Sequence, residues 1–475
     1  MKIKFKKIQR LISNYRKDDI FNFCIAALDR NKDNIQFPIW YIFSLMKWTY
    51  LFGGKRTSPK RLTQNKFKKI SNLILDFNQE HITQFIKEDI NKGFQILHNQ
   101  QFYLQRSIYK EIYATQISIF VTTGKKYDIN QSFKEKTGLS IIDFLYISQI
   151  VWLYSNTDEL NENEFKFDGY FYNDFWEILK KVKSEDKINS FLKLLTLNNK
   201  DAEKAISTFK YRMRDKNLQT MEKSFFIMFP FIIHKNQTRL IHKKLLPYVI
   251  SYYIYDFLKS NDDKFTTELG YRLEKYVSLG LNELNFNYQT ENDLKKRLKK
   301  GSKLVDFYIE TENIFIEVKA SEIQPYPSVN PKDNLIFNSL KTSIFKAYFQ
   351  QLLEVSKQIS PNKENWGIII TFKEYFWSRF SDLYEIGKSK YPNLTSIDHL
   401  PPENVFIIDI YTWNKIIQIV KDKKATLSQI LKKVKKNNSN KLTSKQIFEM
   451  HLDDYNLTGF HLDYLENELN EMKIG

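Results

Sequence analysis

Two carboxylates and one lysine lie within a short stretch of the chain, at Asp306, Glu317 and Lys319. Residues 304–310 and 314–320 are expected to form two short strands joined by a polar turn. In each strand three apolar residues occupy alternate positions, Val305, Phe307 and Ile309 in the first and Ile314, Ile316 and Val318 in the second. Because side chains alternate across a strand, each strand would bury an apolar row and place the charged residues on the opposite, polar face. Two carboxylates and an amine at this spacing can hold a divalent cation and activate a water. The spacing therefore indicates a hydrolytic metal site.

Asp306 and the run Glu317-Val318-Lys319 resemble the motif of the PD-(D/E)xK nuclease superfamily, whose members share the restriction-endonuclease-like fold. The resemblance implies an α/β core with the order α-β-β-β-α-β around a mixed central sheet. It also implies Mg2+ or Mn2+ held by Asp306, Glu317 and the carbonyl of Val318. Lys319 would orient the attacking water or stabilise charge in the transition state. Val305 departs from the pattern, because it stands where the motif has proline.

Two helices of this core are expected, one on each side of the motif. Residues 267–277 look like the first helix, which in this superfamily often carries a glutamate facing the site, here Glu274. Residues 339–359 look like the second helix, with Gln350 and Gln351 where many members place a polar residue near the metal. The structural alternative is that Glu274 only borders the apolar row of its helix and that the glutamines are solvated.

Further strands complete the expected core. Residues 286–289 and 366–372 read as its first and fourth strands, and residues 404–410 as an additional strand followed by a helix over 412–420. The resemblance covers about residues 225–420. The alternative for the charged pair of strands is an amphipathic hairpin whose outer face is merely solvated.

The rest of the chain divides by pattern into flanking regions. We expect residues 1–220 to form a mostly α-helical N-terminal domain for target recognition or partner binding, residues 221–425 the nuclease-like domain, and residues 426–475 a basic and then acidic extension. The acidic end would be a solvated helix, or would dock on a basic groove or a partner. Three-and-four spacing of apolar residues predicts helices, and an apolar run before a polar turn predicts a β-hairpin. The helices are expected over 70–77, 82–97, 102–120, 139–154, 176–183, 187–197, 202–214 and 245–259, and the hairpin over 225–241.

The chain is strongly basic, with 73 Lys and Arg against 55 Asp and Glu and a formal net charge of +18. This charge favours a polyanionic partner, with nucleic acid first, although Lys, Asn, Ile and Phe enrichment is also typical of an AT-rich genome. Basic runs over residues 55–69, 295–303 and 421–441 are candidate phosphate contacts, and the alternative for each is a solvated surface. Candidate nucleic-acid contacts are Lys55, Arg56, Lys60 and Arg61 in the first run and Lys295, Lys296, Arg297, Lys299, Lys300 and Lys303 in the second.

Composition excludes several classes of protein. Hydrophobic residues make up 42% of the 475 residues, which is typical of globular domains and not of a disordered chain. Cys24 is the only cysteine, so the chain can form neither an internal disulfide nor a Cys-based zinc site. No apolar run is long enough to span a bilayer. We therefore expect a cytoplasmic protein without a membrane partner.

Together these observations predict a Mg2+- or Mn2+-dependent endonuclease that hydrolyses phosphodiester bonds in DNA, most simply double-stranded DNA. A long helical region before such a core resembles components of bacterial restriction and anti-phage defence systems. Cutting two strands requires two sites, so a homodimer or a second defence subunit is expected. Two alternatives stay open: a catalytically silent scaffold subunit that binds nucleic acid, and a nuclease of transposase or resolvase type that processes DNA ends or branches.

Overall fold

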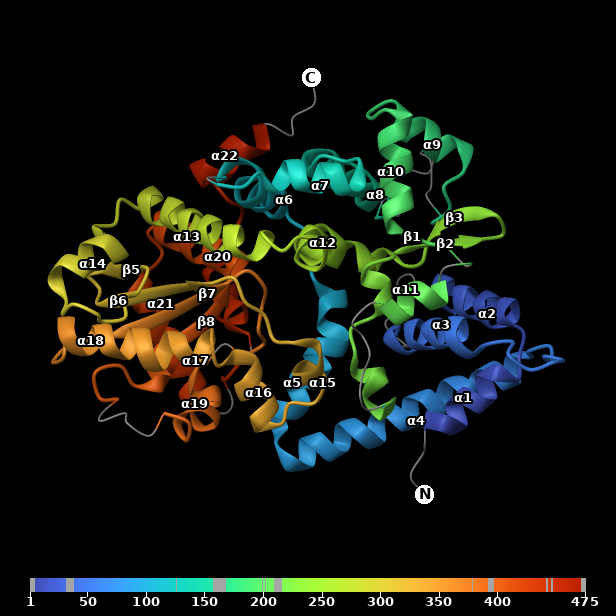
Figure 1. The fold of residues 1–475 in the computed structure, drawn as a ribbon, viewed down its shortest axis with the longest axis horizontal. Helices are drawn as coiled ribbons and strands as arrows, with labels where there is room; N and C mark the ends of the chain where they lie inside the picture. Colours follow the sequence, from blue (N-terminus) through green and yellow to red (C-terminus); the bar gives the residue numbers. More distant parts are fainter. Residues whose placement is uncertain are drawn as a thin grey trace. The chain divides into compact units, whose positions relative to one another are not determined.

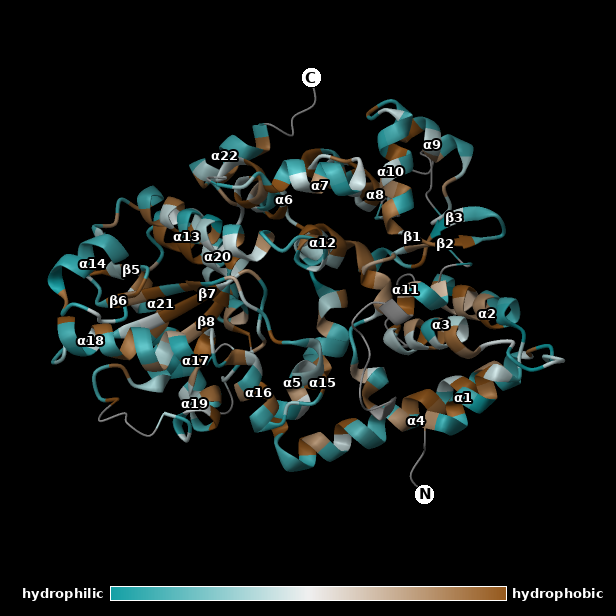
Figure 2. Ribbon diagram, in the orientation of Figure 1, coloured by the Kyte–Doolittle hydropathy of each residue, from teal (hydrophilic) through white to brown (hydrophobic). Residues whose placement is uncertain are grey.

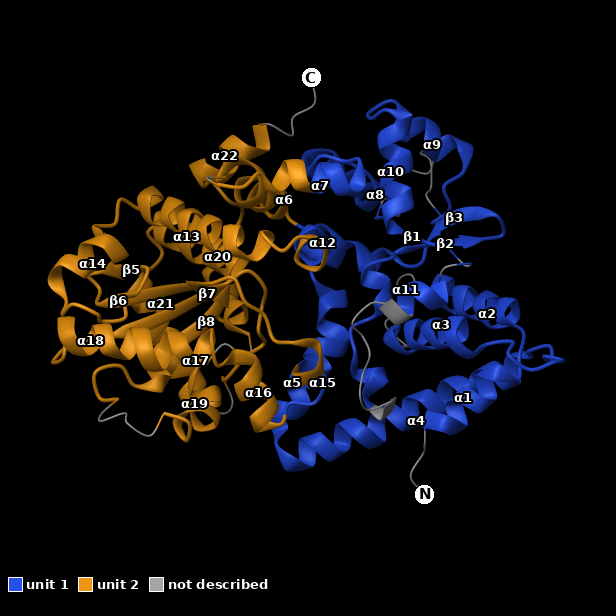
Figure 3. Cartoon of the chain, viewed as in Figure 1, with its two compact units in different colours: residues 1–108, 133–257, 328–331 blue, residues 109–132, 258–327, 332–475 orange. Residues whose placement is uncertain are grey.

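The computed structural model describes residues 5–30, 38–124, 126–156, 168–198, 200, 202–208, 216–377, 379–391, 397–440, 443–445 and 447–470. The chain separates into two compact units (Figure 3). Unit 1 comprises Met1–Ile108, Phe133–Phe257 and Ser328–Pro331, and unit 2 comprises Tyr109–Ser132, Leu258–Pro327 and Lys332–Gly475. Both are rich in helices, and each contains one small mixed sheet (Figure 1).

Unit 1 is mostly helical, as the apolar spacing of residues 1–220 predicts. Its sheet has the order β1-β2-β3, in which β1 runs parallel and β3 antiparallel to β2. Its helices are α1 (Phe5–Ser13), α2 (Lys17–Arg30), α3 (Trp40–Phe52), α4 (Gln64–Glu88), α5 (Ile90–Gln101), α8 (Ile141–Ser155), α9 (Asn173–Lys180), α10 (Glu185–Leu195) and α11 (Ala202–Thr208), and its strands are β1 (Thr196–Leu197), β2 (Phe231–His234) and β3 (Gln237–Leu240). The helix α7 (Ile129–Thr137) and the helix α12 (Leu246–Asn261) contribute residues to both units.

Two of the helices predicted for the N-terminal half are interrupted. The helix expected over 82–97 is broken at Asp89, whose extended backbone ends α4 and whose side chain accepts a hydrogen bond from Asn91 N at 2.9 Å to begin α5. The helix expected over 102–120 is a 3-10 turn at Phe102–Gln105, then α6 (Lys110–Ile117), then a π-helical turn, η2 (Ser118–Thr122). The apolar residues keep their helical spacing across both breaks, so the spacing does not predict them. The last residues of the helix expected over 202–214 lie outside the described residues.

The predicted hairpin is present, but its first strand begins later than expected. Phe225–Ile227 form a 3-10 turn, and β2 begins only after Pro230. Lys235 and Asn236 both have positive φ, at 50° and 61°, which is the two-residue turn that matches strand twist. Because β2 also pairs with β1, the hairpin belongs to unit 1. The sequence places this hairpin after its boundary at 220/221, in the second domain, whereas the two units are interleaved along the chain and the hairpin lies in the first of them.

Unit 2 is built on a five-stranded sheet of the order β4-β5-β6-β7-β8. The pairs β4-β5 and β5-β6 are antiparallel, and β6-β7 and β7-β8 are parallel. The strands are β4 (Tyr288–Thr290), β5 (Phe307–Ile309), β6 (Ile314–Lys319), β7 (Trp366–Thr371) and β8 (Val405–Asp409). The helices around them are α6, α13 (Phe265–Glu283), α14 (Glu291–Arg297), α16 (Asp333–Leu340), α17 (Ile344–Lys346), α18 (Leu353–Ile359), α19 (Ser381–Lys388), α20 (Ile410–Lys421), α21 (Leu427–Ser439) and α22 (Asp463–Asn470).

Helices cover both faces of this sheet, and its central strands are apolar (Figure 2). The helix α13 contacts β6, and α20 contacts β7 and β8. A π-helical segment, η7 (Ala347–Leu352), joins α17 to α18 and also contacts β6. Phe315 on β6 and Ile369 on β7 belong to the core on the η7 face and are fully buried. The alternative of an amphipathic hairpin with a merely solvated outer face is therefore wrong, because nearly all residues of β5 and β6 are buried.

The residues expected to form a C-terminal extension fold into unit 2. Ser428 at the start of α21 donates its backbone N–H to Glu312 in the β5–β6 turn at 2.6 Å. The helix α22 packs against α6 and α13, and Thr122 donates to Glu468 Oε2 at 2.6 Å. The acidic end thus contacts its own unit. None of the helices in the described ranges is by itself both long and apolar enough to cross a membrane, and the one pair that passes jointly, α7 with α8, is bent by 67°.

Candidate active site

The pairing of β5 with β6 brings the predicted motif residues together. Phe307 lies opposite Ile316, so Asp306, the residue before β5, comes beside the last residues of β6. Asp306 Oδ2 accepts a hydrogen bond from Val318 N at 2.6 Å. The ammonium of Lys319 donates to Glu317 Oε1. The two strands therefore assemble Asp306, Glu317 and Lys319 into one cluster, as their spacing predicts.

Glu317 is the innermost member of the cluster. Its side chain is fully buried, that of Lys319 is 21% exposed, and Asp306 is partly exposed. Gln351 Nε2 donates to Glu317 Oε1 at 2.6 Å and to the carbonyl of Leu304 at 2.9 Å. Among the residues that the structure describes, no hydrogen-bond partner reaches Glu317 Oε2. A buried carboxylate oxygen without a partner is costly, and it is the kind of atom that a cation would satisfy.

The environment raises the pKa of both carboxyl groups. Burial, together with the charge of Asp306, raises the pKa of Glu317 to about 8, although Lys319 and Gln351 act in the opposite direction. Burial raises the pKa of Asp306 to about 6 against the lowering effects of Lys319 and of the Val318 N–H. Burial also opposes the charge on Lys319, but the carboxylates around it raise its pKa. One lysine therefore does not balance the two buried carboxyl groups.

Val318 presents its backbone to the same edge of β6. Its N–H points to Asp306, and the N–H and C=O of one strand residue point to the same neighbouring strand. The carbonyl of Val318 therefore faces the side of β6 on which Asp306 lies. This is the arrangement expected of a third ligand oxygen.

Two further glutamates influence the cluster. Glu274 lies on α13, which contacts β6; burial and the charge of Asp306 raise its pKa to about 7. Glu291, the first residue of α14, donates its backbone N–H to Asp306 O at 3.2 Å, and its charge contributes to the raised pKa of Asp306 and of Glu274. Glu274 is among the residues that the sequence predicts at the site, whereas Glu291 is not. The pairing of Thr290 with Phe307 could have placed Glu291 beside Asp306.

Of the two glutamines predicted near the site, the structure brings one to it. Gln351 contacts Glu317, whereas Gln350 is exposed on the helix surface. Of the two, only Gln351 is therefore placed to act at the cluster, and no contact among the described residues supports the expected catalytic role of Gln350. Both lie in the π-helical segment η7, where an added residue changes which side chain of the helix faces the sheet. Periodicity of 3.6 residues cannot anticipate that change.

The second basic run begins in the last turn of α14, the helix whose first residue contacts Asp306, and continues beyond that helix. All of the contacts predicted in this run are exposed: Lys295, Lys296, Arg297, Lys299, Lys300 and Lys303. Arg297 also donates to Gln289 Oε1 at 2.6 Å along the sheet edge. The first run belongs to unit 1, where Lys55 pairs with Glu203 at 2.7 Å and Arg56, Lys60 and Arg61 are exposed. Part of the third run forms α21, which contacts the β5–β6 turn at the other end of β6.

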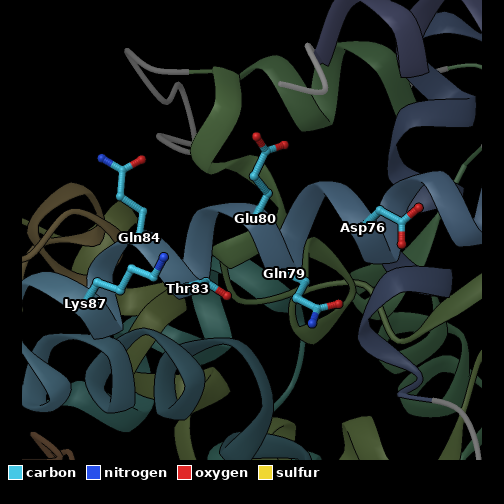
Figure 4. A pocket seen from close by; sticks show the side chains of 6 residues that line it. All are labelled: Asp76, Gln79, Glu80, Thr83, Gln84 and Lys87. Carbon is cyan, nitrogen blue, oxygen red and sulfur yellow. The ribbon is translucent and has the colours of Figure 1, made fainter. Parts of the chain in front are cut away.

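Unit 1 contains a surface hollow whose side chains, unlike those of the cluster in unit 2, do not converge. It lies along α4 and is lined by Asp76, Gln79, Glu80, Thr83, Gln84 and Lys87. Figure 4 shows these side chains spread along the helix and pointing apart, not converging on one point. This hollow offers no grouping of catalytic side chains.

The cluster of Asp306, Glu317 and Val318 offers oxygen atoms, the donor type that a hard cation such as Mg2+ prefers. Within the described ranges, no three side chains from His, Cys, Asp and Glu are grouped closely enough to hold a metal ion by themselves. Mg2+ needs fewer protein ligands, because it keeps several waters and binds through one or two carboxylates. Asp306, the unpaired Oε2 of Glu317 and the carbonyl of Val318 are suitable oxygen donors.

The chain was compared with protein-family models, with curated proteins and with solved structures, and none of the three comparisons gave a match.

Proposed function

We propose that this chain is a metal-dependent nuclease whose active site lies in unit 2. The observation that carries the proposal is the fully buried Glu317 with an unpaired oxygen, placed beside Asp306 and Lys319. Burial raises the pKa of both carboxyl groups, and the charge of Asp306 raises that of Glu317 further, so a bound cation would be favourable there. The sheet order and the position of α13 before it are consistent with a restriction-endonuclease-like core.

Each residue has a defined part in the proposed hydrolysis. Asp306, Glu317 and the Val318 carbonyl would hold Mg2+ or Mn2+, which when bound polarises the scissile phosphate and lowers the pKa of a coordinated water. Lys319 Nζ donates a hydrogen bond to the attacking water or to the developing charge on the phosphate. Gln351 fixes the carboxylate of Glu317 in place. Glu274, whose pKa is about 7, can accept a proton near neutral pH.

The proposed substrate is DNA, because the exposed lysines of residues 295–303 lie at the end of α14 and after it, the first residue of α14 contacts Asp306, and these lysines can neutralise backbone phosphates. Cutting both strands of a duplex would need two such sites, so we propose a homodimer or a second subunit for that reaction. A silent scaffold subunit is the competing function. Such a subunit would contain a buried carboxyl group with an unpaired oxygen and no ligand. This group would lower the free energy of unfolding, and no bound ligand would offset the loss.

Replacing Asp306 with Ala tests the proposal. The variant should lose cleavage of supercoiled, linear and single-stranded DNA and of RNA in Mg2+, because a metal ligand is removed. It should stay folded, since the substitution loses one hydrogen bond, worth about 1 kcal/mol. The matched control is Glu354→Ala on the exposed face of α18. Cleavage by the Asp306 variant at the wild-type rate would remove the site assignment. A wild type that binds nucleic acid but neither takes up Mn2+ in calorimetry nor cuts would be the scaffold.

A further inference from the structure

The helix α13 has one solvent-facing strip that leads to the candidate active site. Burial alternates regularly along this helix, with pairs of buried residues separated by pairs that are exposed or half-exposed. We call the part of this second set formed by Thr267, Gly270, Tyr271, Glu274 and Lys275 the α13 strip. Residues three and four apart share a helix face, so the strip runs continuously from Thr267 to Glu274. Glu274 is the point at which it meets the carboxylates of the site.

Gly270 lies in the interior of α13, where glycine is unfavourable by up to about 1 kcal/mol relative to alanine. A Cβ at Gly270 would find nothing within 4 Å. Gly280 in the same helix differs, because a Cβ there would lie 2.9 Å from Trp413 Nε1. Packing within the described protein thus explains Gly280 and does not explain Gly270. A molecule bound along the strip would explain the glycine, because any side chain at position 270 would occupy the space that this molecule needs.

Tyr271, next to Gly270, is one of the few large apolar side chains that remain exposed, at 45%. The Nζ atom of Lys126 lies 5.1 Å from the centroid of its ring. Close to it in sequence, Lys264 lies 5.8 Å from the ring of Tyr127. Tyr127 is only partly exposed, so Tyr271 offers the open ring of this pair. An exposed aromatic ring beside lysines is the kind of surface on which a base stacks while cations hold the backbone phosphates.

We infer that the α13 strip is the binding track for an unpaired strand of nucleic acid, which passes over Gly270, stacks a base on Tyr271 and delivers its backbone to the carboxylate cluster. This inference rests on the proposed nuclease function and specifies its substrate as single-stranded nucleic acid or the unpaired end of a duplex.

The choice of an unpaired strand follows from stacking geometry. In a duplex, both faces of an internal base are covered by its neighbours, so an exposed tyrosine can stack only on a base that is unpaired or terminal. Lys126, Lys264 and Lys275 are exposed and supply positive charge beside the strip. Asp262 holds Tyr127 through a hydrogen bond from the phenol of 2.5 Å, which fixes that ring in position.

The test measures binding separately from cleavage. Binding of a short single-stranded DNA oligonucleotide carrying 2-aminopurine, and of the matched blunt duplex, is measured in EDTA, where no cutting occurs. Tyr271→Ala should weaken single-strand binding about 10-fold, since one stacked base contributes about 1–3 kcal/mol, and should abolish the fluorescence change of the stacked base. The matched control is Tyr109→Ala, because Tyr109 is 49% exposed and has the Lys415 Nζ at 5.4 Å from its ring. That variant should bind as wild type does.

Gly270→Gln gives an independent measurement. Glutamine is a good helix former and enters open space, so the melting temperature should stay the same or rise by about 1–2 °C. Binding of the single strand should nevertheless fall about 10-fold or more, because the side chain occupies the track. A purely structural glycine would give unchanged binding.

The outcomes separate the inference from the function on which it rests. Equal single-strand binding by wild type, Tyr271→Ala and Gly270→Gln overturns the track, and so does a wild type that binds no oligonucleotide or only the blunt duplex. If cleavage in Mg2+ is intact in those cases, the nuclease assignment stands. Conversely, single-strand binding that depends on Tyr271, without cleavage in Mg2+ or Mn2+, supports the binding track and overturns the proposed nuclease activity.

Discussion

Replacing Glu317 with glutamine should make unit 2 more stable at neutral and alkaline pH in the absence of metal, although it removes a proposed metal ligand. Burial, with the charge of Asp306, raises the pKa of Glu317 from 4.5 to about 8. The folded protein therefore keeps a proton that the unfolded chain releases. Stability from this protonated group is fully present below about pH 4.5 and is lost as the pH rises through about 8.

The size of this effect follows from the two pKa values. The gap between 4.5 and about 8 corresponds to about 5 kcal/mol at high pH, taking about 1.4 kcal/mol for each pKa unit. By pH 7 the unfolded carboxyl is ionised and the folded one mostly is not, and the loss is about 3 kcal/mol. Glutamine has no proton to release and keeps the shape of the side chain. The measured gain is smaller by the cost of leaving Lys319 without this carboxylate.

Hydrogen exchange of peptides from β5 and β6 is the suitable assay, because a chain of two units need not unfold in one step. The protection of Glu317→Gln relative to wild type, measured in EDTA, should grow between about pH 5 and pH 8. Glu354→Gln on α18 is the control and should show no such trend. Mn2+ should restore wild-type protection at high pH and leave the variant unchanged. A wild-type-to-variant difference that is constant with pH would refute the assignment of a buried, proton-holding carboxyl group.

Two further predictions address catalysis and binding. Lys319→Met keeps the apolar stem and removes the charge, so calorimetric Mn2+ binding should persist while cleavage falls by orders of magnitude; loss of both together would mean that Lys319 is structural. Exchanging Lys295, Lys296, Lys299 and Lys300 for glutamine should reduce the slope of log affinity for duplex DNA against log salt by up to about 3.6, at about 0.9 for each phosphate contact. The same exchange of four lysines on α21 should leave the slope unchanged, and equal effects would identify the first set as ordinary surface.

The elements around the site could be predicted because their patterns are local. The strands over 314–320 and 366–372 are confirmed as β6 and β7, and the register of β5 with β6 brings Asp306 to Glu317 as expected. Alternation alone could not show that the charged face is covered. Phe315 shares a face with Glu317 and is fully buried, since η7 packs over both. Burial of that face depends on a helix about 30 residues further along the chain.

The elements that were missed depend on backbone irregularity or on distant contacts. The break at Asp89 and the π-helical turns η2 and η7 interrupt segments whose apolar spacing is continuous. The hairpin lies in unit 1, where β2 pairs with β1, a two-residue strand that no pattern could have indicated. The conformation of such segments is determined by their pairing partners in the folded chain. Local sequence propensity does not predict those partners.

The irregular segment η7 also determines the chemistry of the site. A regular α-helix over 344–359 would place successive side chains at 100° intervals, and either Gln350 or Gln351 could then face the sheet. The π-helical turn directs Gln351 to Glu317 Oε1 and leaves Gln350 exposed. With Oε1 occupied by Gln351 and Lys319, the remaining oxygen, Oε2, stays without a partner. The helix irregularity thus holds the carboxylate by one oxygen and keeps the other available, which is the arrangement that a cation held jointly with Asp306 requires.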